Sequence, residues 1–67
     1  GGRFYDVNLW VESIGNTSFV LGYEVVGEDG IVHAKVKSVQ VAVSMETKKS
    51  RPITETEREF LTSYMKA

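Results

Sequence analysis

The chain has 67 residues, 42% hydrophobic and 25% charged, with a formal net charge of −1. That charge excludes the basic surface that nucleic-acid binding needs, and the apolar runs fall far short of the roughly 20 residues that span a bilayer. With no cysteine and one histidine, the chain can form neither a disulfide nor a Cys/His zinc site, so we expect no metal or other cofactor. We also expect a cytoplasmic location, because no secretory signal opens the chain.

The first half of the chain predicts an antiparallel hairpin. After Gly1 and Gly2, which we expect to be unstructured, apolar residues alternate from about residue 3 to 13 and again from 18 to 26, as in strands with one buried face. The turn at residues 14–17 contains Gly and Asn, which accept turn geometry. The residues predicted to share the core face are Tyr5, Val7, Leu9 and Val11 in the first strand and Phe19, Leu21, Tyr23 and Val25 in the second.

A third strand is predicted over about residues 31–45, after an Asp-Gly turn at residues 27–30. Its alternation changes phase midway, so the valines of its second part would face away from those of its first part. A bulge near Lys37-Ser38 would return both sets to the core face. Fifteen residues also make a strand of about 50 Å, which would have to bend.

A helix is predicted over about residues 54–66. Pro52 precedes the sequence Thr54-Glu55-Thr56-Glu57, which has the pattern of a capping box, and Lys66 suits the negative end of the helix dipole. One apolar stripe, expected to pack as core, consists of Phe60, Leu61, Tyr64 and Met65. The predicted fold class is therefore α+β, a three-stranded antiparallel meander with a C-terminal helix that is too small to cover the core face alone.

The order of these elements resembles the C-terminal half of hotdog-fold acyl-CoA thioesterases of the 4-hydroxybenzoyl-CoA thioesterase-like group. The patterns that carry the resemblance are Gly-Asn-Thr-Ser-Phe at 15–19, Val-Gln-Val-Ala-Val at 39–43 and Arg-Pro-Ile at 51–53. The match runs from about Tyr5 to Met65 and implies a single partial hotdog-like domain over residues 1–67. It also implies that the N-terminal half, with the helix that fills the curved sheet and the catalytic Asp or Glu, is absent.

The same resemblance supplies candidate ligand contacts. It implies that the first turn lies near the dimer-interface cleft where these thioesterases hold acyl-CoA, and that the later basic segment meets the phosphates of CoA, which Lys and Arg bind well. The simpler interpretations are that the residues of the first turn only form the hairpin and that the basic segment is a solvent-exposed turn. The candidate residues are Asn16, Thr17, Ser18, Lys48, Lys49 and Arg51.

No catalytic residue is predicted from the sequence. Asp6, Glu12 and Glu24 fall on the polar faces of strands, with no base or nucleophile spaced to work with them. No Gly-x-Ser-x-Gly motif surrounds a serine, and His33 is expected on the outer surface of its strand. Hydrolysis by these residues alone is therefore expected to be weak or absent.

Two functions from different classes remain open. The first is a truncated hotdog acyl-CoA thioesterase-like protein that binds acyl-CoA or CoA; the second is a non-catalytic oligomerising interaction or ligand-binding module. Both imply a homo-oligomer, a dimer or tetramer, because so small a core needs a further means of stabilisation. Neither nucleic acid nor a membrane is an expected partner. Phe4 and Trp10, two aromatics on an otherwise polar strand face, are either interface residues or ordinary exposed ones.

Overall fold

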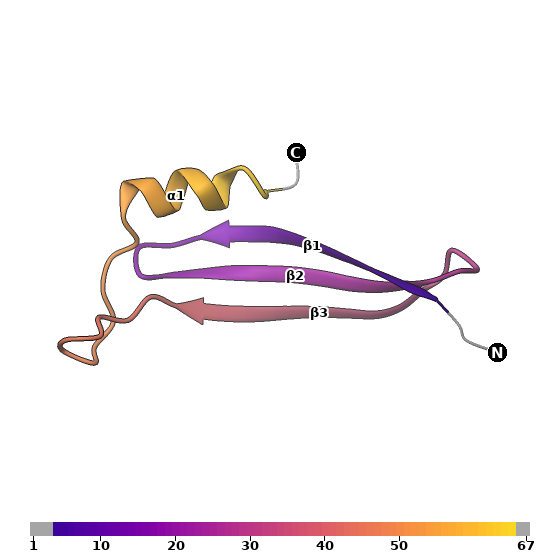
Figure 1. Cartoon of the computed structure of the whole chain (residues 1–67), viewed down its shortest axis with the longest axis horizontal. Coiled ribbons are helices and arrows are strands. Elements are labelled where there is room, and N and C mark those ends of the chain that lie inside the picture. Colours follow the sequence, from indigo (N-terminus) through magenta and orange to yellow (C-terminus); the bar gives the residue numbers. More distant parts are fainter. Residues whose placement is uncertain (1–3, 66–67) are drawn as a thin grey trace.

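The computed structural model describes residues 4–65 and shows a small α+β domain, as predicted (Figure 1). The elements are β1 (Tyr5–Ile14), β2 (Ser18–Gly27), β3 (Val32–Val41) and α1 (Glu55–Thr62). The strands form one antiparallel meander in the order β1-β2-β3, and the helix follows it. The expectations for Gly1, Gly2, Arg3 and Lys66 lie outside the described residues.

Short hydrogen-bonded turns join the three strands. In the first, the Gly15 amide donates to the Ser18 carbonyl at 2.7 Å. In the second, the Gly30 amide donates to the Gly27 carbonyl at 2.9 Å, and Gly30 has a φ of 80°, a conformation that glycine adopts without strain. The Asp29 carboxylate accepts from the Ile31 amide at 2.9 Å, and this bond lowers the pKa of Asp29. Both turns predicted from the sequence are therefore present.

The register divides the sheet into two chemically different faces, because residues directly opposite one another point to the same side. One face, here called the apolar face, carries no charged residue at its paired positions. Its larger side chains are Tyr5, Val7, Leu9, Val11, Ile14, Phe19, Leu21, Tyr23, Val25, Val36 and Gln40. The other, here called the mixed face, combines valines with Trp10, Glu24, Lys35 and Lys37.

The predicted bulge near Lys37-Ser38 is wrong. Pairing is continuous there, with Gly22 opposite Lys37 and Leu21 opposite Ser38. The register instead shifts at His33, beside the second turn, and in β1 between Val11 and Ser13. The later valines therefore stay on the mixed face, where Val39 is 66% and Val41 54% exposed.

The third strand is also shorter than predicted, because the chain turns after residue 43. The Ser44 hydroxyl accepts from the amides of Glu46 and Thr47, both at 3.3 Å, which closes a local turn in place of further pairing with β2. Val43 then forms an isolated antiparallel bridge with Ser50. Residues 43–50 are thus a small separate loop and not the end of a 15-residue strand.

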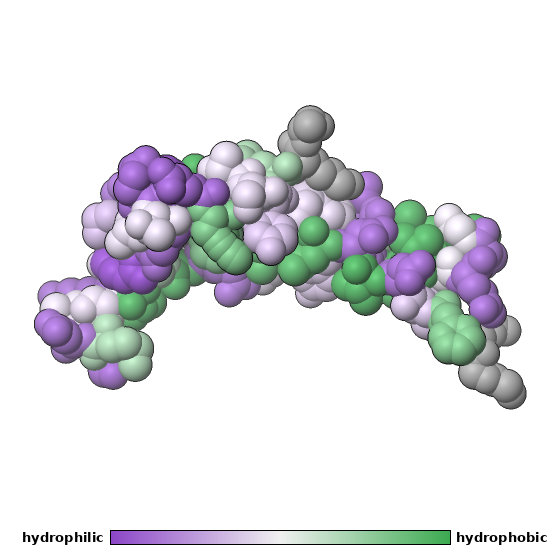
Figure 2. Space-filling model, turned by 45° about the horizontal axis from the view of Figure 1, so that its top comes forward, coloured by the Kyte–Doolittle hydropathy of each residue, from purple (hydrophilic) through white to green (hydrophobic). Residues whose placement is uncertain are grey.

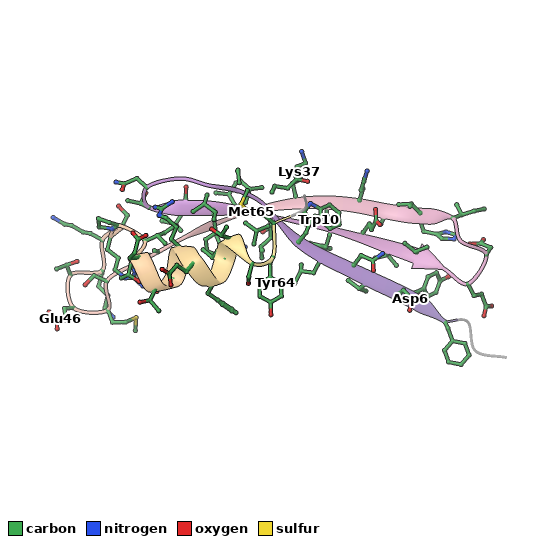
Figure 3. The ribbon with its side chains drawn as sticks, turned by 90° about the horizontal axis from the view of Figure 1, so that it is seen from above. Asp6, Trp10, Lys37, Glu46, Tyr64 and Met65 are labelled. Atoms are coloured by element: carbon green, nitrogen blue, oxygen red, sulfur yellow. The ribbon has the colours of Figure 1, made fainter. Side chains whose placement is uncertain are left out.

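The predicted capping box is confirmed and starts α1. The Thr54 hydroxyl accepts from the Glu57 amide at 3.2 Å, and the Glu57 carboxylate accepts from the Thr54 amide at 2.9 Å. The helix ends at Thr62, before the predicted end. The chain then meets the outer edge of β1, where the Val11 amide donates to the Tyr64 carbonyl at 2.9 Å. Figure 3 shows α1 on the side of the sheet opposite Trp10 and Lys37.

Burial within the domain is slight. Among residues 4–65, the buried hydrophobic side chains are Trp10, Val11 and Ile53. No residue of α1 is buried, so the prediction that its apolar stripe packs as core is wrong for the chain alone: Phe60 is 54% and Tyr64 56% exposed. The Cα radius of gyration is 15.2 Å, against about 11 Å for a compact domain of this length.

Candidate functional site

A hollow of about 360 Å³ lies between α1 and the end of the sheet near the first turn. Its size is at the lower end of the range for small-molecule sites. Apolar side chains form most of its wall, and the polar groups come from the first turn of α1. The lining residues are Phe19, Ala42, Ile53, Thr56, Glu57, Phe60 and Leu61.

The turn proposed from the sequence as a ligand contact adjoins this hollow through its backbone. The Asn16 carbonyl accepts from the amide of Ile53, and the Thr17 carbonyl accepts from the amide of Ala42, both at 2.8 Å. Both donors belong to residues of the hollow wall, and Ser18 precedes a third wall residue, Phe19. The turn carbonyls are therefore engaged within the fold, while the Asn16 side chain is exposed and those of Thr17 and Ser18 are half-buried.

On the α1 side of the hollow, the wall residue Glu57 forms a two-bonded ion pair with Arg51. The Arg51 guanidinium donates to the two Glu57 carboxylate oxygens at 2.8 and 2.9 Å, a geometry that fixes both side chains. These bonds, with the one from the Thr54 amide, lower the pKa of Glu57 to about 2. Glu57 is thus a weak base already occupied by two donors, which suits it poorly to general-base catalysis. A phosphate would have to compete with Glu57 for Arg51.

Lys48 and Lys49 lie apart from this ion pair, in the loop of residues 43–50. The Lys48 backbone is left-handed, with a φ of 61°, and its amide donates to the Ser44 carbonyl at 2.8 Å. Both side chains are exposed, and within residues 4–65 neither ammonium group forms an ion pair. Their arrangement fits a solvated basic turn. None of the six candidate residues lines the hollow: Asn16, Thr17, Ser18 and Arg51 are bonded to or adjacent to wall residues, and these two lysines lie farther away.

A larger feature, which the sequence predicted only as a face in need of cover, is the part of the apolar face beyond α1. Here this region is called the open half; it consists of Tyr5, Val7, Leu9, Tyr23, Val25, Ala34 and Val36. Val7 is 64% and Leu9 59% exposed, although both lie on the strand face that the alternation assigned to the core. Figure 2 shows hydrophobic residues continuing along the molecule past the helix. A second hollow of about 280 Å³ marks the boundary, with Leu9 and Tyr64 in its wall.

On the mixed face, Trp10 is buried, so the expectation of an exposed aromatic is wrong for this residue. Its ring lies over Gly22, the residue opposite it in β2, where a Cβ atom would come within 2.6 Å of the ring. The indole nitrogen donates to the Glu12 carboxylate at 2.7 Å, and Lys37 lies 4.0 Å from the same carboxylate. Phe4, at 76% exposure, remains available to a partner.

His33 is exposed, as predicted, but its placement on the outer face is wrong, because its ring lies on the apolar face over Gly27, the residue opposite Tyr5. Its Nε2 lies 3.4 Å from an Asp29 carboxylate oxygen, and its ring meets the edge of Tyr5 at a centroid distance of 5.7 Å. Across residues 4–65, no group of three or more His, Cys, Asp or Glu side chains could hold a metal ion. No helix in the described part of the chain has the length and apolarity to cross a membrane.

These features define a class at the level of the fold: a small α+β protein with a three-stranded antiparallel meander, one short C-terminal helix and an exposed apolar sheet face. Comparisons with protein-family models, with curated proteins and with solved structures found no match. The likeness to hotdog thioesterases stays a prediction, based on the order of elements and the short patterns quoted above.

Proposed function

We propose that this chain is a self-associating interaction module whose apolar face is covered by another subunit. The observation that carries the proposal is the open half, a sheet surface with no charged residue at its paired positions and with large exposed side chains such as Val7 and Leu9. The exposed Asp29–His33 pair lies at its outer end, over Gly27. Soluble monomers seldom expose contiguous apolar patches of more than a few hundred Å², and larger ones mark sites of association.

The exposed area of the whole chain supports the same proposal. Its accessible surface is 5199 Å², whereas a compact monomer of this mass would expose about 4,200 Å². The excess of about 1,000 Å² is close to the roughly 800 Å² that each partner buries in an ordinary stable interface. One interface of ordinary size would therefore bring the chain to the exposure of a compact protein.

The proposal predicts that folding and association are linked. Because a partner subunit binds the native state, the midpoint of thermal unfolding should rise with protein concentration. Circular dichroism melts over a hundredfold range of concentration measure this directly. A midpoint that does not change over that range would contradict self-association.

A second candidate is an acyl-CoA-binding scaffold of the hotdog thioesterase type, which the hollow beside α1 favours. Its apolar wall suits a short acyl group, and Asn16, Thr17, Ser18 and Arg51 adjoin it. In this proposal Lys48 and Lys49 contribute charge toward the CoA phosphates from the neighbouring loop. Hydrolysis by these residues alone is expected to be weak or absent, since the one carboxylate in the hollow wall, that of Glu57, is held by Arg51 and Thr54.

Thermal shift with CoA tests the second candidate. Binding to the native state should raise the unfolding midpoint, and the double change Lys48→Ala and Lys49→Ala should reduce that rise. Lys35→Ala removes an exposed lysine from the mixed face and serves as the matched control. A midpoint unaffected by millimolar CoA would contradict ligand binding, and substantial hydrolysis of short-chain acyl-CoA would contradict the expected lack of activity.

A further inference from the structure

We propose that the subunit covering the apolar face is a second copy of this chain, packed face to face and related by a two-fold axis that runs across the strands. In this arrangement each α1 lies on the open half of the other copy's sheet. The inference rests on the proposed self-association and adds the orientation of the two copies. Three properties of the molecule support it: the position of α1, its length and the chemistry of the two surfaces.

The helix lies beside β1 at one end of the apolar face. It lies near the first turn, its following segment reaches β1 at Val11, and no other element within residues 4–65 covers the apolar face beyond that point (Figures 1 and 3). A two-fold axis across the strands exchanges the two ends of the face. It therefore sets each copy's helix against the other copy's open half, and no two helices meet at the same place.

The dimensions of the two parts agree. An eight-residue helix is about 12 Å long at roughly 1.5 Å per residue. The open half extends along β1 from Tyr5 to Leu9, about 13 Å at roughly 3.3 Å per residue. One helix thus matches the β1 part of the open half in length, and the same contact is made twice, as a two-fold interface requires.

The surfaces are also chemically alike. Phe60 of α1 and Tyr64, two residues past its end, stack at a centroid distance of 5.2 Å, and each is more than half exposed. They would meet Val7, Leu9 and their neighbours, so that aromatic and aliphatic groups are removed from water together. Aromatic side chains are enriched in the buried centres of interfaces.

The other surfaces of the sheet account less well for the exposed area. Packing through the mixed face would desolvate Glu24, Lys35 and Lys37, which is costly unless each charge finds a partner. Pairing of two β3 edges would satisfy backbone groups but leave the apolar face in water. Face-to-face packing removes apolar side chains such as Val7 and Leu9 from water without burying a charge at the paired positions.

Cross-linking between single-cysteine variants tests the arrangement, since the natural chain has no cysteine. Val7→Cys protein mixed with Phe60→Cys protein should form a covalent heterodimer with a short bifunctional maleimide. The control mixture replaces Val7→Cys by Val39→Cys. Val7 is 64% and Val39 66% exposed, so the two positions react with similar ease but lie on opposite faces. Equal yields in the two mixtures would contradict the arrangement.

Charged substitutions give a second, independent readout. Val7→Asp and Phe60→Asp should each weaken dimerisation at least tenfold in sedimentation equilibrium, while Val39→Asp should leave it within about twofold. Two results together would refute this orientation and leave self-association standing: unchanged dimer affinity in Val7→Asp and Phe60→Asp, and no preferential Val7–Phe60 cross-link. A wild-type monomer would refute both. If the aspartate variants fail to fold, the cross-linking yields decide, because cysteine replaces valine and phenylalanine without adding charge.

Discussion

At the scale of single residues, Trp10 and Gly22 show how an aromatic side chain on a polar strand face can be buried without a second layer. The two residues are opposite one another in β1 and β2, and the absence of a side chain on Gly22 leaves the sheet surface flat enough for the indole ring. The ring nitrogen then donates to Glu12, which keeps its polar group satisfied. The alternating sequence pattern identifies the face of Trp10, but it carries no information about this cross-strand space.

Gly22→Ala should therefore destabilise the fold. The added methyl group would lie 2.6 Å from the indole ring, and relieving such a clash costs about 1–3 kcal/mol. Urea unfolding of the two proteins measures the loss. In a Trp10→Leu background the same change should cost clearly less, because the ring is no longer there. An equal cost in both backgrounds would show that Trp10 does not occupy this space.

Glu57 provides a pH-dependent prediction. Its pKa falls from 4.5 to about 2 in the folded chain, chiefly because Arg51 donates to the carboxylate. A carboxyl group with a lowered folded-state pKa stabilises the fold above its unfolded value, and that stabilisation is lost as pH falls from about 4.5 to about 2.

The stability difference between wild type and Glu57→Gln should accordingly be largest above pH 5 and should shrink toward pH 2. Unfolding midpoints in denaturant at several pH values measure this difference. Arg51→Gln removes the main cause of the shift and should leave a smaller pH dependence. A difference that stays constant from pH 6 to pH 2 would contradict the role of the ion pair.

At the scale of elements, the start of α1 is predictable because its determinants are local. Thr54 and Glu57 satisfy each other's backbone amides within one turn, and the spacing alone reveals this. The end of α1 is not predictable in the same way, since it coincides with the contact between Tyr64 and Val11, which are far apart in the sequence. The apolar stripe continues past Thr62, but the chain leaves the helix to meet β1.

Thr54→Ala should cost about 1 kcal/mol, the usual value for loss of an N-cap hydroxyl. Thr56→Ala provides the control, since Thr56 is an exposed threonine of the same helix that caps nothing. Chemical denaturation followed by far-ultraviolet circular dichroism compares the two variants. Comparable losses in both would indicate that the capping box contributes little to α1.

The third strand shows where periodicity misleads. The change of phase between Val36 and Val39 predicts a bulge only if every valine must face the core. In the structure the valines divide between the faces, and β-branched residues are common in strands whether or not they are buried. The real irregularity lies at His33, next to the second turn, where the sequence gives no signal.

The candidate site is likewise only partly predictable: the order of the candidate ligand residues in the chain does not reveal that Arg51 pairs with Glu57.

At the scale of the whole molecule, the sequence predicts a sheet face too large for one helix, and the structure shows how much is uncovered. Alternation identifies Tyr5, Val7 and Leu9 as core residues, yet each is about half or more exposed in the single chain. These strands have the sequence pattern of buried strands but the exposure of surface strands, which supports the proposal that another subunit covers them. We propose that a second copy of this chain does so, and that the hollow beside α1 is a separate, smaller site.

Sedimentation equilibrium of the purified chain tests this central claim most directly. The account predicts a dimer, with a mass twice that of the 7.5 kDa chain, which dissociates only on dilution. Val7→Asp protein should sediment as a monomer under the same conditions, and Val39→Asp protein as a dimer. A single species of 7.5 kDa for the wild type at every concentration, folded by circular dichroism, would contradict the account.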